Sequence, residues 1–192
     1  KSAPLTIYQA GFLASLVSTD PKYVVFSCLG AVFGDGFNIL ARKYSKMMCP
    51  GNPICESPLL ESGVGSIEEC GFFKKPSLSV NELKNNSFGM PSGHSQMVSL
   101  TATFWTLYQV GKLKKETNET KRNLLMGSIG CMWGLALLIM YHQRKLNCHN
   151  WEQIIVGGFL GVLLGFTCYL LASNIPGVNV PHINNILYDE ET

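Results

Sequence analysis

Residues 151–172 read WEQIIVGGFLGVLLGFTCYLLA, a long apolar stretch in the last third of the chain. Its length is close to the ~20 residues that a helix needs to cross the hydrocarbon core of a bilayer. Because lipid offers no hydrogen-bond partners to peptide groups, such a stretch is expected to form a helix. Gly157, Gly161 and Gly165 recur at every fourth position and predict a ridge of small residues on which a second helix packs closely.

Four more apolar stretches precede this one, at roughly residues 5–18, 23–41, 96–110 and 124–141. The chain has 46% hydrophobic and 15% charged residues, whereas a soluble globular domain has about 25% charged residues. We therefore expect one all-α domain over residues 1–192, a polytopic transmembrane helical bundle with about five visible spans. A soluble helical bundle with an unusually apolar core is the alternative. The net charge of +2 gives no case for binding nucleic acid.

The polar segments between these stretches predict the loops. Residues 42–90 contain several prolines and are expected to form one long loop, of the kind that often carries function. Residues 111–123 form a short lysine-rich link, and residues 173–192 a polar tail that we expect to be solvated. If successive spans alternate in direction, the long loop and the short loop 143–150 emerge on one face of the membrane. The link and the tail then emerge on the other face.

Two histidines lie at helix starts on the same predicted face. His94 stands in GMPSGHSQ (residues 89–96) and His149 in CHNWEQ (residues 148–153), each running directly into an apolar stretch. The free N–H groups and positive dipole end of a helix start form a ready anion site. The two rings therefore indicate a nucleophile and a general acid acting on a phosphate. Interfacial histidines on well-capped membrane helices are the structural alternative.

Basic residues flank both segments: Arg42, Lys43 and Lys46 at the start of the long loop, Arg144 and Lys145 in the short one. Their charges are suited to neutralise a phosphate and stabilise its transfer. Cations next to membrane spans also act as interfacial anchors or topology signals. Each cation alone therefore indicates little.

These segments resemble the motifs of the type 2 phosphatidic acid phosphatase and haloperoxidase superfamily. Its three motifs are Lys-x6-Arg-Pro, Pro-Ser-Gly-His and Ser-Arg-x5-His-x3-Asp. Residues 91–94 match the second motif completely, and His149 stands at the nucleophile position of the third. The other motif positions depart from the pattern: Arg42 for Lys, Cys49 for Arg, His142 for Ser, Gln143 for Arg and Gln153 for Asp.

Two branches of the superfamily are especially similar. Dolichyl diphosphatases carry Gly-Met-Pro-Ser-Ser-His-Ser-Gln and His-Thr-Trp-Ser-Gln segments, which residues 89–96 and 149–153 resemble. Glucose-6-phosphatases share a Gly-Asp-x2-Asn sequence, which residues 34–38 match, and a long loop before the second motif. The dolichyl-type resemblance extends over both histidine motifs and implies a lipid phosphate or dolichyl-type diphosphate as substrate. A sugar-phosphate phosphatase is the alternative.

The resemblance implies a mechanism that needs neither a metal ion nor a cofactor. His149 is implied to attack phosphorus and form a phosphohistidine, while His94 protonates the leaving group and later activates water. Gln153, one helical turn after His149, is placed to accept a hydrogen bond from its ring and fix the tautomer. The implied phosphate ligands are Arg42, Ser92, Gly93 and Arg144.

The missing motif arginines leave the activity open. A lysine nearby does not reproduce the bidentate fork of arginine, and the loss of one transition-state donor costs about 10²–10³ in rate. A catalytically impaired relative that binds phosphorylated lipid or a partner is therefore a further alternative. Members of the superfamily usually have six membrane helices, so the resemblance implies one span beyond the five visible. The oligomeric state stays open.

Cysteines and glycosylation patterns bear on the orientation in the membrane. Four cysteines fall on the predicted catalytic face, where an oxidising lumen permits disulfides: Cys49, Cys55, Cys70 and Cys148. Asn85 begins an Asn-x-Ser pattern on that face, and Asn118 begins an Asn-x-Thr pattern on the other. We expect an integral protein of the endoplasmic reticulum with a luminal catalytic face, on which Asn85 is modified and Asn118 is not.

Overall fold

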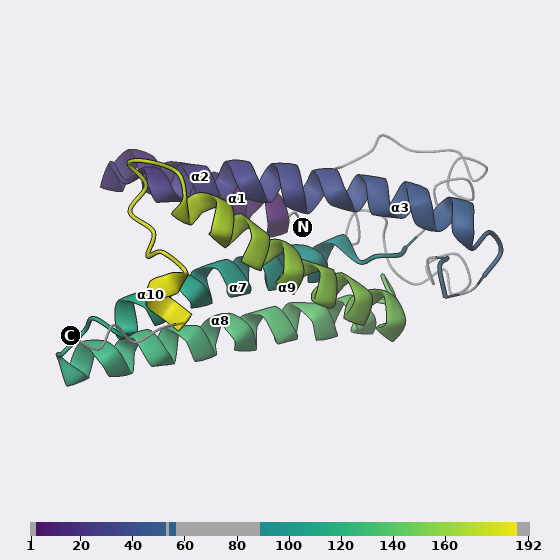
Figure 1. Ribbon diagram of the computed structural model, residues 1–192. Helices are drawn as coiled ribbons and strands as arrows, with labels where there is room; N and C mark the ends of the chain where they lie inside the picture. The colour runs from purple at the N-terminus through teal and green to yellow at the C-terminus, as the bar shows by residue number, and fades with distance from the viewer. Residues whose placement is uncertain (1–2, 53, 57–88, 188–192) are drawn as a thin grey trace.

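Every regular element in the described part of the chain is a helix. The computed structural model describes residues 3–52, 54–56 and 89–187. The elements are α1 (Ala3–Ser18), α2 (Pro21–Leu29), the π-helix η1 (Gly30–Gly36), α3 (Phe37–Met48), α7 (Gly93–Leu113), α8 (Glu119–Lys145), α9 (Trp151–Ser173) and α10 (Asn184–Leu187). The long helices run side by side in an elongated bundle (Figure 1). All five apolar stretches lie in helices, so the predicted all-α bundle is confirmed.

Within the described residues, three helices are long and apolar enough to cross a membrane: the continuous helix Pro21–Met48, α8 and α9. α8 turns an apolar surface outward, on which Leu135, Leu137 and Leu138 are 58–62% exposed. Water-soluble proteins rarely expose apolar patches of this kind. The soluble-bundle alternative therefore does not fit, and the structure is that of a membrane bundle.

α7 is the central helix and packs against both α8 and α9. Its polar residues Ser95, Gln96, Ser99 and Thr103 are buried and face the interior of the bundle. Polar side chains within a membrane bundle are expected to face inward, where other helices shield them from lipid. This placement explains how α7 can carry these polar residues although it lies at the centre of the bundle.

The glycine ridge of α9 packs directly against the backbone of α7. A Cβ atom at Gly157 would lie 2.5 Å from the carbonyl oxygen of Ser92, and one at Gly161 would lie 2.2 Å from that of Gln96. Gly165, one turn further along, meets the same helix as closely. No larger side chain fits at these positions, so the predicted close packing is confirmed. It also fixes the start of α9 against the start of α7.

α2, η1 and α3 form one continuous helix with a π-helical middle. Such π-turns break the regular backbone hydrogen-bond pattern and are frequent at functional sites. In this one, the carbonyl oxygen of Gly34 accepts a hydrogen bond from Nε2 of Gln96 at 2.8 Å. One turn later, Asn38 donates from Nδ2 to Oε1 of Gln96 at 2.8 Å. Residues 34–38 thereby attach this helix to the start of α7.

α3 continues to Met48, beyond the expected start of the long loop at residue 42. The apolar stretch ends near residue 41, but arginine, lysine and methionine are good helix formers. Arg42 is also held by the bundle, because its Nε donates to the carbonyl oxygen of Pro91 at 3.3 Å. The expected loop start is therefore wrong by almost two turns of helix.

The tail folds back on the bundle instead of extending into solvent. The hydroxyl of Tyr169 donates to the carbonyl oxygen of Pro181 at 2.6 Å, and Val180 is buried. A Cβ atom at Gly111 would lie 2.6 Å from Cβ of Pro181, and α10 packs on α7. The expectation of a solvated tail is thus wrong for the side chains that pack on the core, Val178, Val180, Ile183 and Ile186, whereas residues 174–177, 179, 182 and 184 are exposed as expected. The apolar side chains between the prolines outweigh the polar ones that suggested it.

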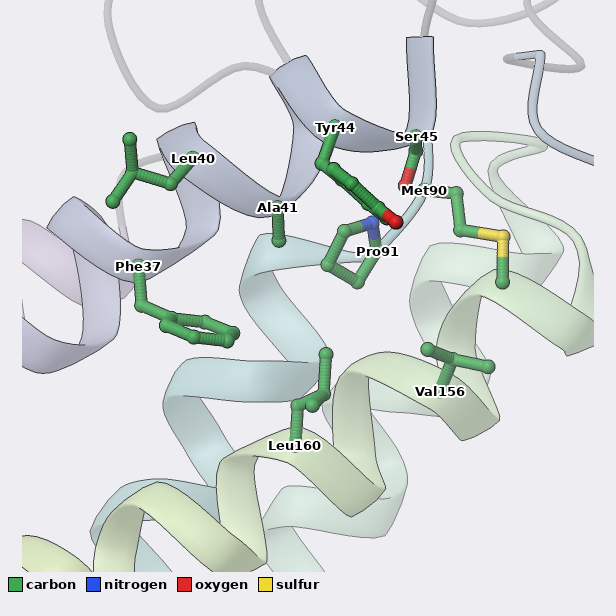
Figure 2. A pocket seen from close by; sticks show the side chains of 9 residues that line it. All are labelled: Phe37, Leu40, Ala41, Tyr44, Ser45, Met90, Pro91, Val156 and Leu160. Carbon is green, nitrogen blue, oxygen red and sulfur yellow. The ribbon is translucent and has the colours of Figure 1, made fainter. Parts of the chain in front are cut away.

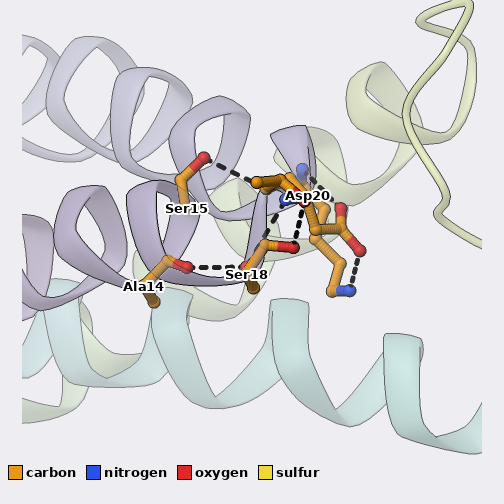
Figure 3. A network of polar contacts seen from close by, with 6 residues as sticks. Ala14, Ser15, Ser18 and Asp20 are labelled. Carbon is orange, nitrogen blue, oxygen red and sulfur yellow. Dashed lines mark hydrogen bonds and ion pairs between the residues drawn. The ribbon is translucent and has the colours of Figure 1, made fainter.

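A polar turn joins α1 to α2 (Figure 3). Asp20 caps α2 by accepting a hydrogen bond from the backbone N–H of Lys22 at 3.0 Å, and the Lys22 ammonium also pairs with the carboxylate. Ser15 donates from Oγ to the carbonyl oxygen of Asp20 at 3.1 Å. The Lys22 ammonium lies 5.3 Å from the ring centroid of Tyr108, near the end of α7. This turn therefore belongs to the end of the bundle where α7 ends.

The loops gather at two opposite ends of the bundle. At one end, the ends of α3 and α8 lie near the starts of α7 and α9 (Figure 1). There Asn150 donates from Nδ2 to the carbonyl oxygen of Ile54 at 3.3 Å, which joins the short loop to the beginning of the long one. At the other end, Pro181 of the tail contacts Gly111 beside the link. The predicted common face of the two histidine segments is confirmed.

Candidate active site

The side chain of Gln153 holds the ring of His149. His149 lies in the turn between α8 and α9 and is 4% exposed. Gln153 lies in the first turn of α9 and is fully buried, with Oε1 2.9 Å from Nδ1 of His149. Asn150 caps α9 by accepting a hydrogen bond from the backbone N–H of Gln153 at 3.0 Å. The cap fixes the helix start, and with it the position of both side chains.

The amide group of Gln153 has a single orientation. Its Nε2 donates to the carbonyl oxygens of Ile54 at 2.9 Å and of Glu56 at 2.7 Å. An amide nitrogen only donates and an amide oxygen only accepts, so Oε1 has to face the histidine. Nδ1 of His149 then carries the hydrogen, and the lone pair is left on Nε2. This is the tautomer that a nucleophilic Nε2 requires.

His149 is neutral in the folded protein. Burial lowers the pKa of its imidazole to about 3, and the positive charge of Arg42 adds to this lowering of the pKa. The ring of His94 acts on the pKa of His149 in the same direction. Arg42 and His94 thus both lie near enough to influence the ring. A neutral imidazole keeps the lone pair that nucleophilic attack uses.

The start of α7 lies beside Gln153. Ser92 caps α7, its Oγ accepting hydrogen bonds from the backbone N–H of Ser95 at 3.4 Å and from the Ser95 hydroxyl at 3.0 Å. The backbone N–H of Ser92 donates to the carbonyl oxygen of Gln153 at 3.1 Å, which joins the two histidine segments directly. Gly93 and His94 are the first residues of α7 and are buried. The positive end of the α7 dipole therefore lies in the same place.

Arg42 reaches this place from α3. Its Nε donates to the carbonyl oxygen of Pro91 at 3.3 Å, and Nδ2 of Asn38 lies 3.4 Å from the same oxygen. Two side chains of α3 thus hold the residue that precedes the α7 cap. The structure brings together all the predicted site residues except one: Arg42, Ser92, Gly93, His94, His149 and Gln153.

Arg144, the remaining predicted site residue, makes a different contact. Its Nη1 donates to Oδ1 of Asn147 at 3.1 Å, within the turn that follows α8. In the described part of the chain, the hydrogen bonds that join the other site residues do not include this guanidinium.

Comparison with known proteins identifies the family. The family model described as the PAP2 superfamily matches residues 23–176. The chain belongs to this superfamily. The match covers four of the five long helical segments, both histidine motifs and Arg42, so the resemblance found in the sequence is confirmed.

Curated proteins named as phosphatases are similar to part of the chain. Dolichyldiphosphatase 1 of Dictyostelium discoideum is 35% identical over 88 residues, which cover 46% of the chain and 37% of that protein. Dolichyldiphosphatase 1 of Homo sapiens is 26% identical over 91 residues, 46% of the chain and 38% of that protein. Lipid phosphate phosphatase 1 of Arabidopsis thaliana is 29% identical over 93 residues, 46% of the chain and 27% of that protein. The chain spans less than two fifths of the length of these relatives, and no solved structure matches it significantly.

Two positions show what replaces the PAP2 motif arginines. Cys49 forms a disulfide with Cys55, so the first of these positions supplies a crosslink and not a cation. Gln143 occupies the second, is 5% exposed, and has no hydrogen-bond partner for its Oε1 among the described residues. Buried polar atoms are nearly always paired. Gln143 is therefore a candidate ligand contact, and its motif position was the sequence signal that pointed to it.

Other residues hold the candidate site, the cluster of Arg42, Ser92, Gly93, His94, His149 and Gln153 that we call the PAP2 site, and the sequence gives little or no indication of them. The backbone carbonyl groups of Ile54 and Glu56 hold Gln153, and any residue type supplies such a group. Asn38 holds Gln96 and Pro91, and its only signal was the match of residues 34–38 to the glucose-6-phosphatase branch. Two residues that the sequence placed on this face, Cys70 and Asn85, lie outside the described residues.

An apolar groove of about 380 Å³ adjoins the PAP2 site between α3 and α9 (Figure 2). Its lining consists of Phe37, Leu40, Ala41, Tyr44 and Ser45 of α3, the pair Met90 and Pro91, and Val156 and Leu160 of α9. Pro91 belongs to both features, because its ring lines the groove while its carbonyl oxygen accepts the hydrogen bond from Arg42. If the charged end of a molecule lay at Arg42, the atoms next to that end would lie in this groove.

Proposed function

We propose that this protein is a membrane phosphatase that hydrolyses a lipid phosphate or an isoprenoid diphosphate through a phosphohistidine on His149. The arrangement of His149 and Gln153 carries the proposal, because it leaves the Nε2 lone pair of a neutral, buried ring for attack on phosphorus. The membership in the PAP2 superfamily supports it.

The first step forms the covalent intermediate. The Nε2 lone pair of His149 forms the N–P bond while the P–O bond to the leaving group breaks. The electron pair of that bond stays on the leaving oxygen, which takes a proton from the ring of His94. This ring is neutral in the empty site and takes up that proton together with the negatively charged phosphate. General acid catalysis of this kind contributes about 10²–10⁴-fold. The Nδ1–H bond to Gln153 keeps the ring oriented as its positive charge develops.

The second step returns the enzyme to its initial state. A water molecule attacks phosphorus, His94 takes its proton, and the N–P bond breaks with its electron pair returning to Nε2 of His149. The sum is the hydrolysis of one phosphoric ester or anhydride bond, with release of inorganic phosphate. No other group of the protein changes its charge over the cycle.

Phosphate oxygens are assigned to the start of α7 and to the cation on α3. Backbone N–H groups at a helix start stabilise the charge that develops in the transition state. In this assignment Ser92, Gly93 and Arg42 hold the phosphate directly, since hydrogen bonds join the segments on which they lie. Arg144 remains a proposed second cation, and Gln143 the amide that takes the place of the motif arginine.

The apolar groove favours a lipid over a soluble sugar phosphate. Its walls are almost entirely carbon, and several of its side chains face the surroundings of the bundle, among them Leu40 with 65% exposure. An isoprenoid or acyl chain fits such a surface, whereas the hydroxyl groups of a sugar would find few partners. The relatives named as dolichyldiphosphatases and as a lipid phosphate phosphatase agree with this substrate class.

A phosphate-release assay in detergent with EDTA tests the proposal. The substrates are farnesyl diphosphate, a phosphatidic acid and glucose 6-phosphate. We expect release from the lipids, its near-complete loss in His149→Ala and His94→Ala, and wild-type rates in His182→Ala, whose ring is exposed in the tail. Full activity of His149→Ala would refute the nucleophile, and release from glucose 6-phosphate alone would refute the lipid substrate.

We also propose that the site faces the lumen of the endoplasmic reticulum. The disulfide between Cys49 and Cys55 and the disulfide-bonded state of Cys148 support an oxidising compartment on this side. At the opposite end of the bundle, Asn118 caps α8 by accepting a hydrogen bond from the backbone N–H of Lys121 at 3.1 Å. Glycosylation mapping in microsomes is expected to find modification at Asn85. Modification at Asn118 would reverse the orientation.

A further inference from the structure

A disulfide-closed turn follows the last residues of α3. Cys49 and Cys55 close it, and we call its described residues, 49–52 and 54–55, the Cys49–Cys55 turn. Within it, Asn52 accepts hydrogen bonds from the backbone N–H of Cys55 at 2.9 Å through its carbonyl oxygen and from that of Ile54 at 3.0 Å through Oδ1. The backbone N–H of Cys49 donates to the carbonyl oxygen of Ser45 at 3.0 Å, which continues α3 into the turn. The turn is thus anchored to α3 at one side and crosslinked at the other.

This turn contacts both histidine segments. The carbonyl groups on either side of Cys55, those of Ile54 and Glu56, accept both hydrogen bonds of the Gln153 amide nitrogen at 2.9 and 2.7 Å. The carbonyl oxygen of Cys55 itself accepts a hydrogen bond from the backbone N–H of Gly89 at 3.0 Å, at the beginning of the His94 segment. Gly89 approaches so closely that a Cβ atom there would lie 2.5 Å from Oε1 of Gln153.

The position of these carbonyl groups decides the orientation of the Gln153 amide. If they were displaced, the amide would be able to rotate and present Nε2 to the imidazole, because both ends of an amide are similar in size. His149 would then accept a hydrogen bond at Nδ1, and its own hydrogen would reside on Nε2. A protonated Nε2 has no lone pair with which to attack phosphorus.

We propose that the Cys49–Cys55 disulfide is a positioning element of the active site, which holds the carbonyl groups of Ile54 and Glu56 against Gln153 and thereby keeps His149 in its nucleophilic tautomer. The consequence for catalysis rests on the proposed function, whereas the consequence for the tautomer does not. Cys49, at a motif-arginine position, thus has a role of its own. It supplies no charge to the phosphate, but its crosslink to Cys55 positions the groups that hold Gln153 and, through it, His149.

Nitrogen NMR of the imidazole rings tests the structural part without any need for activity. Long-range ¹H–¹⁵N correlation spectra of the full chain in detergent distinguish the two neutral tautomers, and His149→Gln identifies the signals of His149. We expect the Nδ1–H tautomer in the wild type and a shift toward Nε2–H in Cys49→Ser/Cys55→Ser. The matched control is Cys28→Ser/Cys131→Ser, which removes two exposed free cysteines and is expected to leave the signals unchanged. Wild-type His149 shifts in the disulfide variant would overturn the proposal.

A milder variant covers the case in which the disulfide variant does not fold. Asn52→Ala removes the side-chain hydrogen bond to Ile54 while the disulfide stays in place. A smaller shift of the His149 signals in the same direction is expected, and its absence also counts against the proposal.

Phosphate release then tests the catalytic part. Loss of a group that orients a metal ligand typically costs about 10–100-fold. By analogy, we expect a loss of this size in kcat for Cys49→Ser/Cys55→Ser, with little change in KM. In a Gln153→Ala background the same change should have no further effect, because the two act in series. Losses that multiply would overturn the proposal. A tautomer shift in a protein that releases no phosphate would refute the proposed function and leave the positioning role standing.

Discussion

Oε1 of Gln153 lies 2.9 Å from Nδ1 of His149, and two backbone carbonyl groups hold the nitrogen of the same amide. The third motif of the superfamily usually has an aspartate at this position, whose carboxylate also balances the charge of the ring. An amide oxygen also accepts from the ring, although without the charge of a carboxylate, and the amide requires acceptors for its own N–H groups. The beginning of the long loop provides them.

Replacement of this amide by a carboxylate should therefore impair the protein. In Gln153→Glu, a carboxylate oxygen would face the carbonyl oxygens of Ile54 and Glu56 in a fully buried place. Buried polar atoms without partners cost free energy of folding. We expect a lower Tm in detergent and a kcat lower by about 10–100-fold. Glu152→Gln, at the exposed neighbour, is the control and should match the wild type in both. A Gln153→Glu variant as fast as the wild type would contradict the amide's role.

The free energy of unfolding should decrease as the pH is lowered, and the buried ring of His149 should make this decrease steeper than it would be without the ring. In the unfolded chain its ring takes up a proton below about pH 6.5, whereas in the folded protein burial holds its pKa at about 3. The unfolded state then binds more protons between these values, and the free energy of unfolding falls as the pH falls through this window. Thermal unfolding of His149→Gln between about pH 7 and 4 should show a shallower decline of Tm than the wild type. The same change at exposed His182 should leave the wild-type decline in place, and equal slopes for wild type and His149→Gln would count against a neutral buried ring.

The glycine ridge of α9 should not tolerate a methyl group. In Gly161→Ala, the added Cβ would lie 2.2 Å from the carbonyl oxygen of Gln96, so the two helices must separate. Overpacking of this kind costs about 1–3 kcal/mol, and we expect a corresponding loss in the free energy of unfolding by denaturant titration. Gly130→Ala on α8 is the matched control, since nothing lies within 4 Å of its added Cβ. Because alanine has a higher helix propensity than glycine, Gly130→Ala should keep or slightly raise the free energy of unfolding. Equal effects of the two substitutions would show that the ridge does not determine the packing.

A bulky residue in the apolar groove should discriminate between substrates. Ala41 lines the groove, and Ala41→Trp would fill much of its volume of about 380 Å³. We expect kcat/KM for a long-chain lipid phosphate to fall by about tenfold or more, since displaced apolar contacts are worth about 10–200-fold. A short soluble phosphate ester, which does not reach the groove, should be cleaved as by the wild type. Leu135→Trp, in the crevice between α7 and α8, controls for a tryptophan on the apolar surface. Equal losses for both substrates would remove the groove from the substrate path.

Much of the helical architecture was predictable because it follows from local patterns. The apolar stretch at residues 151–172 and its glycines at positions 157, 161 and 165 predicted a membrane helix and its close packing, and α9 has both. The helix starts at Ser92 and Asn150 follow from their capping side chains. The errors arose where contacts distant in the sequence decide. The hydrogen bond to Pro91 holds Arg42 in α3, in addition to the helix propensity of the residues that follow, and the tail folds back because Pro181 contacts Tyr169 and Gly111.

The local pattern of residues was enough to predict which residue types meet: two histidines and a glutamine at helix starts that alternating spans bring to one face. Their mutual geometry depends on contacts between distant parts of the chain. Gln153 is oriented by the backbone of Ile54 and Glu56, almost a hundred positions away in the chain. Backbone carbonyl groups are the same for every residue type, so the pattern of side chains in the sequence does not predict which of them bind Gln153. Only the folded bundle, with its α7–α9 packing and its disulfide, brings those carbonyl groups to the amide that holds the nucleophile.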